Sequence, residues 1–234
     1  MELIHQEHQG FFFCNNFDMA PSPELYNLLI KEFSRYDLIP SVGHEFNIHT
    51  GQKTQFVTLV NSKDDLRVEF PSHGIVVTQL KTEFEKFYTD FKNIINSLAL
   101  LFPLKKGNRI SLLSSKIFDG TEEQYKEIYL NLFTYKAVNP FEWDNRIAEK
   151  RYILNRSEEV NSISNIKRGE MVSPFFNNGQ PKSVVAFSVD TNTSPTNAKD
   201  RFSFENSIEA YNEIYTNNLR LLQDLSRYEN IRKY

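Results

Sequence analysis

The sequence predicts an α+β fold, with mostly antiparallel sheets packed against long amphipathic helices. Three observations favour this class. Strand-like segments occur in runs between helices rather than alternating with them one by one. The segments 82–102 and 203–225 each repeat apolar residues every three or four positions, as a long helix with one buried face does. The 20 phenylalanines and 11 tyrosines predict a core built from large side chains.

Length and composition exclude several classes of protein. A chain of 234 residues that is 40% hydrophobic can bury a core, so disorder of the whole chain is excluded. The longest apolar stretch, 98–104, is about a third of the ~20 residues that a membrane-spanning helix needs. No basic segment precedes a hydrophobic one at the N-terminus, so we expect no signal peptide, no membrane association and a cytoplasmic location. The net charge of −3 gives no overall attraction to nucleic acid.

Two helices and five strands are expected in the first 102 residues, and a sixth strand is expected before residue 120. A helix begins after Ser22, a good N-cap, with Pro23 at its first position. The long helix 82–102 begins with a capping-box pattern, Thr82 and Glu85, and buries an aromatic face. We expect residues 1–9 to be unstructured and Pro40 to end the first helical region. The strands are predicted over 10–17, 44–50, 54–60, 66–70 and 75–80.

The rest of the chain is expected to follow a similar order. A strand over 109–118 ends at the turn Asp119-Gly120, and Thr121 with Gln124 forms a capping box for the next helix. Ser203 caps the last helix. The remaining strands are predicted over 151–154, 163–172 and 183–189, and the polar stretch 191–200 is predicted to be a surface loop.

Two similar halves follow from this order, 1–120 and 121–234. Residues 22–102 and 121–228 each run helix, several strands, helix, and the strand 109–118 bridges them. We expect them to pack as one compact unit. An ancient duplication is one explanation of the shared order, and chance similarity of pattern is the other.

Three motifs resemble an uncharacterised, sporadically distributed bacterial protein family of about this length. They are the aromatic helix that leads into the strand Arg109-Ile110-Ser111-Leu112, the strand Ala186–Thr191 ending in an acidic residue, and the closing helix with Tyr215-Thr216 followed by Leu219 and Leu221. The resemblance implies the same fold over nearly the whole chain. Because the family has no established activity, it implies no catalytic residues. Its scattered distribution suggests an accessory, defence-related gene neighbourhood.

The common catalytic constellations are missing from the sequence. The five histidines lack the spacing of a metal site, and the lone Cys14 excludes an internal disulfide and any zinc site built from several cysteines. No phosphate-binding glycine-rich loop, dinucleotide fingerprint or nucleophile elbow is present, so we predict no metal, no cofactor and no catalytic residue. One catalytic alternative stays open: Asp119, with Lys116 nearby, or Asp190 could serve a metal-dependent nuclease or hydrolase.

Binding residues are easier to propose. Phe175 and Phe176 follow Pro174 and precede an Asn-Asn-Gly turn, where paired aromatics either cap the core or anchor a partner, with Arg168 near them in the chain. Two basic segments are candidates for contacting nucleic acid: Lys105, Lys106 and Arg109, then Arg146, Lys150 and Arg151.

We therefore predict a non-enzymatic protein-binding or assembly subunit, an accessory component of a bacterial multiprotein system of the defence type. Its protein partner is expected to be encoded nearby. A metal-dependent hydrolase or nuclease is one alternative, and a nucleic-acid-binding accessory protein is the other.

Overall fold

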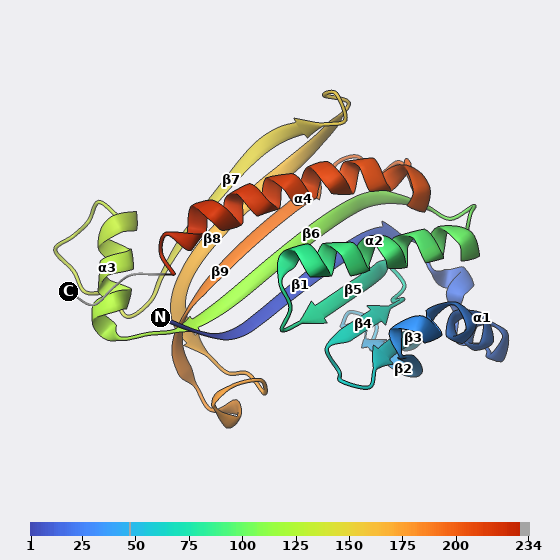
Figure 1. Ribbon diagram of the computed structural model, residues 1–234, viewed down its shortest axis with the longest axis horizontal. Helices are drawn as coiled ribbons and strands as arrows, with labels where there is room; N and C mark the ends of the chain where they lie inside the picture. The colour runs from blue at the N-terminus through green and yellow to red at the C-terminus, as the bar shows by residue number, and fades with distance from the viewer. Residues whose placement is uncertain (47, 230–234) are drawn as a thin grey trace.

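The computed structural model describes residues 1–46 and 48–229 and confirms the α+β class (Figure 1). Four α-helices accompany one ten-stranded sheet in this part of the chain, and every strand pairing in it is antiparallel. The strands are β1 (Glu2–Cys14), β2 (Leu38–Phe46), β3 (Lys53–Asn61), β4 (Leu66–Glu69), β5 (Ile75–Leu80), β6 (Lys106–Asp119), β7 (Trp143–Ile153), β8 (Glu158–Met171), β9 (Lys182–Thr193) and β10 (Phe202–Ser203). The helices are α1 (Pro23–Phe33), α2 (Phe84–Leu101), α3 (Glu122–Leu132) and α4 (Phe204–Ser226).

The sheet runs through both expected halves without a break. Its order is β2-β3-β4-β5-β1-β6-β9-β8-β7, and β10 pairs with β6. The central strands β1 and β6 each pair with the last long strand of a run, β5 and β9 respectively. Because β6 lies before residue 120 and β9 after it, the two halves share one sheet. The duplication stays a prediction.

The two long helices lie side by side over one face of the sheet (Figure 1). The rings of Tyr88 on α2 and Tyr215 on α4 stack with their centroids 4.1 Å apart. The Tyr88 hydroxyl also donates to Asn212 Oδ1 at 2.8 Å. The predicted core positions of α2 are all buried, namely Phe84, Phe87, Phe91, Ile95 and Leu98.

Three of the four predicted helix caps are present. The Ser22 hydroxyl accepts from the backbone N–H of Leu25, and Thr121 forms the expected capping box. Ser203 caps α4 and forms a capping box with Asn206. The fourth prediction, a capping box at Thr82, is wrong: the N-cap is Glu83, which makes no capping bond.

Strand β1 corrects the expectation that residues 1–9 are unstructured. It begins at Glu2 and pairs with β6 from that residue onward. His5 and His8 are both buried in it. A strand this polar carries no local hydrophobic signal, because partners distant in the sequence satisfy its side chains. For example, His8 Nε2 lies 2.8 Å from the backbone oxygen of Thr82.

The first helical region ends at Tyr36, before Pro40 as predicted, and this proline lies in β2, which spans Leu38–Phe46. An edge strand tolerates proline, which has no N–H to donate to the ladder. β2 pairs only with β3 in the described sheet.

The predicted surface loop at 191–200 begins three residues too early. Thr191, Asn192 and Thr193 belong to β9 and are buried. Thr191 Oγ1 donates to Asn218 Oδ1 of α4 at 2.6 Å, and it accepts from Asn217 Nδ2 at 2.7 Å. The polar residues therefore continue the strand because partners distant in the sequence satisfy their side chains: α4 for Thr191, and the backbone of Ile110 in β6 for Thr193.

None of the described helices combines the length and the apolar character that crossing a membrane requires.

Candidate functional site: an uncovered sheet face

The sheet has two unlike faces. One face, here called the helix face, carries Phe12, Leu112 and Val189 and packs in the buried cores beneath the helices. The opposite face, here called the open face, carries their neighbours such as Phe11 and Ser111. Among residues 1–46 and 48–229, all four α-helices bury side chains in cores formed with the helix face, so none of them lies on the open face.

Strand register places the open-face residues in rows across the sheet, because directly opposed residues in antiparallel strands point to the same face. The row through Phe11 continues on one side through Ser111, Asn192, Asn161 and Lys150 of β6, β9, β8 and β7. On the other side it continues through Val76, Glu69, Thr58 and Ser41 of β5, β4, β3 and β2.

The centre of the open face is polar but nearly uncharged. On β6, β9 and β8, three consecutive rows contain only one charged side chain, Asp190. The others are short polar or aliphatic side chains: Ser111, Asn192, Asn161, Leu113, Ile163, Ser115, Ser188 and Asn165.

Side-chain hydrogen bonds hold this centre in place across three strands. The carboxylate of Asp190 accepts from Ser111 Oγ at 2.8 Å and from Asn192 Nδ2 at 2.9 Å. Asn161 Nδ2 donates in turn to Asn192 Oδ1 at 3.2 Å. The bonds fix the side-chain orientations. Ser111 and Asn192 are themselves buried, so Asp190 and Asn161, which are partly exposed, are the members of this network that a docking partner can reach.

Aromatic side chains border the polar centre on β1. The rings of Phe11 and Phe13 stack at 5.6 Å, and both side chains are partly exposed. The Arg109 guanidinium lies over the Phe13 ring, 4.7 Å from its centroid. Arg109 Nε is buried and has no hydrogen-bond partner among the described residues.

A small hollow of about 240 Å³ opens on the same face beside β1, β4 and β5. Phe175, from the loop between β8 and β9, forms one wall, and its ring stacks on that of His5 at 5.0 Å. Burial raises the pKa of Glu69, and the nearby Arg67 opposes that rise. The hollow is acidic, since four carboxylates face one guanidinium: Glu7, Asp64, Asp65 and Glu69 against Arg67.

The predicted partner-binding residues lie in different settings. Phe175 is 55% exposed and lines the hollow, whereas Phe176 is partly exposed beside it in the chain. Arg168 is buried on the helix face, where it donates to Glu122 at 2.6 Å and to the Pro140 oxygen at 3.2 Å. Its guanidinium also lies over the Tyr125 ring, so contacts within the protein already engage this side chain.

The first basic segment does not form a cluster of exposed cations. Lys105 is almost covered and pairs with Asp18 at 2.6 Å, whereas Lys106 is exposed. Arg109 points to the open face, over Phe13.

The second segment lies on β7, and the structure does not join it to the first. Arg146 and Lys150 share the open face with Arg109, but β9 and β8 lie between the two groups, so the strands that carry them, β7 and β6, are about 14 Å apart. Arg151 points to the helix face and pairs with Glu149 at 2.9 Å.

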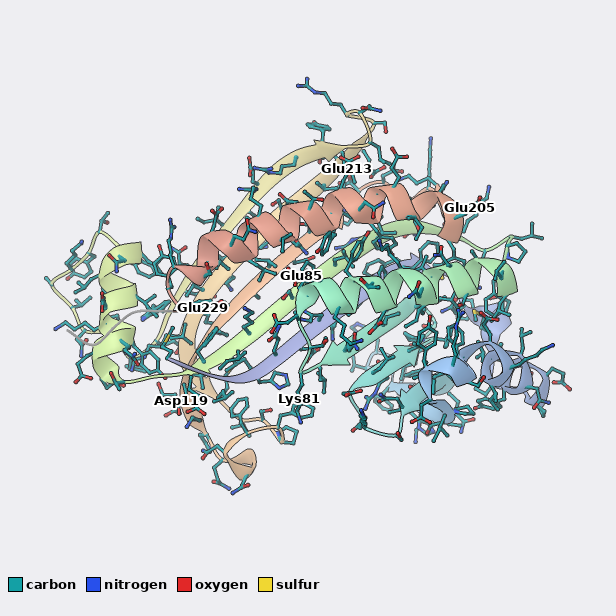
Figure 2. The ribbon with its side chains drawn as sticks, viewed as in Figure 1. Lys81, Glu85, Asp119, Glu205, Glu213 and Glu229 are labelled. Atoms are coloured by element: carbon teal, nitrogen blue, oxygen red, sulfur yellow. The ribbon has the colours of Figure 1, made fainter. Side chains whose placement is uncertain are left out.

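The two candidate catalytic carboxylates are also apart. Asp119 lies at the end of β6 and pairs with Lys182 at 2.7 Å (Figure 2). Asp190 lies on the open face in the hydrogen-bonded centre. No group of three or more His, Cys, Asp or Glu side chains in the described chain has a geometry that could hold a metal ion.

Cys14 is buried, and its thiol donates to Asn16 Oδ1 at 3.2 Å. Burial raises the pKa of this thiol to about 12, so it stays protonated near neutral pH. A protonated, buried thiol is a poor nucleophile.

Sequence reasoning missed the open-face centre because serine and asparagine carry no strong strand signal. Alternation gives no signal either, because Ile163 lies between Asn161 and Asn165 on this face and Leu113 lies between Ser111 and Ser115. Only the pairing of β6, β9 and β8 shows that these positions share a surface.

No protein-family model matches this chain, and no curated protein matches it. Among solved structures, the chain is similar to a rolling circle replication initiator protein from Geobacillus stearothermophilus, with a TM-score of 0.29. The identity is 8%, over 84% of this chain and 76% of that one. A likeness this weak carries no argument about fold or function. The resemblance to a bacterial family stays a prediction.

Proposed function

We propose that this protein is a non-enzymatic protein-binding subunit, and that it binds its partner on the open face. One observation carries the proposal: a ten-stranded sheet packs its four described helices on one face and leaves the other without a helix. The exposed side of an antiparallel sheet is ordinarily rich in charged residues that favour water. Here its centre combines serine, asparagine and partly exposed phenylalanine.

These side chains suit protein recognition. Serine and asparagine supply adaptable hydrogen bonds in antibody binding sites, and aromatic rings supply contact area with little loss of entropy. Charged residues are depleted at the centres of protein interfaces, as they are on β6, β9 and β8. The charged side chains Arg146 and Lys150 lie instead toward the β7 side.

The hollow beside Phe175 supports the same proposal. An aromatic wall and an excess of carboxylates favour a basic side chain from the partner, which would stack on the ring and pair with Glu69. We propose that the partner is a protein encoded near this one, in an accessory, defence-type system.

The two alternatives are less well supported. For a hydrolase, Asp190 and Asp119 would have to give up the hydrogen bonds and the ion pair that now engage them. For nucleic acid, the exposed cations would have to act from separate places on the sheet. No specific observation favours either function.

Two variants separate binding from catalysis. Phe175→Ala removes the wall of the hollow, and we expect it to weaken capture of the protein encoded beside this gene at least tenfold. Asp190→Asn keeps the shape of the side chain and removes its charge, and we expect activity in cells to persist wherever binding persists. Circular dichroism should first establish that both variants fold.

The decisive contrary result concerns Asp190→Asn. If that variant folds and binds its partner like the parent, yet loses all biological activity, the hydrolase alternative replaces the binding proposal.

A further inference from the structure

The edge strand β7 offers an unpaired backbone to another chain. It runs for 11 residues and pairs with β8 alone among the described strands. Most of its side chains between 144 and 150 are exposed, and Ile147 near its centre is 60% exposed. A long edge strand without such protection as proline or a bulge is a template for pairing with a further strand.

The opposite edge differs. β2 contains Pro40, which cannot donate to a neighbouring strand, whereas β7 contains neither proline nor glycine. Charged side chains also protect edge strands against pairing with other strands, and β7 carries five of them. The arrangement of these charges therefore decides which partner strand β7 accepts.

A second copy of the same strand is the simplest occupant to test. Two copies related by a two-fold axis perpendicular to the sheet pair antiparallel, and each residue then faces a residue of the other copy at an equal distance from the axis. The axis can pass through any one residue of β7. Placing it through Arg146 or through Glu149 sets that charged side chain against its own copy. Placing it through Ala148 sets Arg146 against Lys150.

The axis through Ile147 removes every such conflict. It pairs all nine residues from 143 to 151 within the strand, and it sets Ile147 against Ile147 of the second copy. Asp144 of each copy then faces Lys150 of the other, which makes two equivalent pairs. Arg146 of each copy faces the small Ala148 of the other. Asp144 already lies opposite Lys167 on its own sheet, so the charges alternate in sign across the junction.

We propose that two copies of this chain pair through β7 in the register centred on Ile147, forming one continuous sheet. Pairing nine residues adds about eight to ten backbone hydrogen bonds. The exposed Ile147 side chains meet on the helix face, and the two Asp144–Lys150 pairs lie on the open face. The pairing does not depend on the partner-binding role of the open face.

The test is to measure the mass of the protein in solution by light scattering coupled to size-exclusion chromatography, over a range of protein concentrations. We expect the parent to reach twice the chain mass of 27.5 kDa as concentration rises. Ala148→Lys faces Arg146 of the second copy, so it should raise the dimer dissociation constant about tenfold. Ala148→Glu places an opposite charge at the same position, so it should lower that constant.

A charge exchange tests the register independently. Asp144→Lys should weaken the dimer, because it opposes Lys150 of the second copy, and adding Lys150→Glu to that variant should restore it. Lys63→Glu, in the turn between β3 and β4, is the matched control and should change nothing. A parent that stays monomeric overturns the proposal. So does a dimer indifferent to both Ala148 variants, or one that the charge exchange does not restore.

Discussion

His8 should make the stability of the protein fall as the pH falls from about 7 to about 4. Burial in β1 lowers its pKa from 6.5 to about 4, since the helix face gives the imidazolium no water. The unfolded chain takes up this proton near pH 6.5 and the folded chain only near pH 4. Between these values the unfolded state binds more protons, so acid favours unfolding.

The size of the effect follows from the two pKa values. A pKa lowered from 6.5 to about 4 corresponds to about 3 kcal/mol, because one pKa unit is worth about 1.4 kcal/mol. About 2 kcal/mol of that is lost between pH 7 and pH 5. The stability is fully present above the unfolded pKa and is lost as the pH falls through the folded one.

Denaturant unfolding at several pH values, followed by the fluorescence of the buried Trp143, measures this loss. His8→Gln removes the titrating group, and its unfolding free energy should decline about 2 kcal/mol less than the parent's between pH 7 and pH 5. His73→Gln, at an exposed histidine, should behave like the parent. Equal pH dependence of the parent and His8→Gln would refute the assignment.

Two further predictions concern the core. Phe91→Ala should cost about 3–5 kcal/mol of unfolding free energy, because the fully buried ring packs edge-on against Tyr211 and lies over Gly10. Leu100→Ala, on the exposed side of α2, should cost about 0.5 kcal/mol or less. A similar loss of unfolding free energy for both variants in denaturant titrations would contradict the packing. Cys14 should resist iodoacetamide at pH 8 in the folded protein and react after denaturation, as followed by intact mass; rapid labelling of the folded chain would show that the thiol is neither buried nor protonated.

Elements with strong local signals could be predicted from the sequence. The face of α2 follows from apolar residues at helical spacing, and the starts of α1, α3 and α4 follow from their capping residues Ser22, Thr121 and Ser203. The hairpin between β4 and β5 follows from two apolar runs around Pro71 and Gly74. In each case residues within a few positions of one another determine the structure.

Elements that depend on distant partners could not be predicted. The polar start of β1 is stable because β6 pairs with it and because the backbone oxygen of Thr82, far along the chain, accepts a hydrogen bond from His8. Thr191 is buried because Asn217 and Asn218 bond to it from α4. The same limit applied to the candidate site: Phe175 could be predicted as an aromatic at a loop, but the open face exists only through strand order.

The most direct test of the account is the affinity of the neighbouring gene product for a variant that carries a bulky charge at the centre of the open face. Ser188→Lys places an ammonium between Ser115 and Asn165, where solvent can still reach it in the unbound protein. Ser34→Lys makes the same substitution at an exposed site beyond α1. With both variants folded, the account predicts that Ser188→Lys raises the dissociation constant at least tenfold and that Ser34→Lys leaves it unchanged. Equal binding by Ser188→Lys and the parent would contradict the central claim that this face binds the partner.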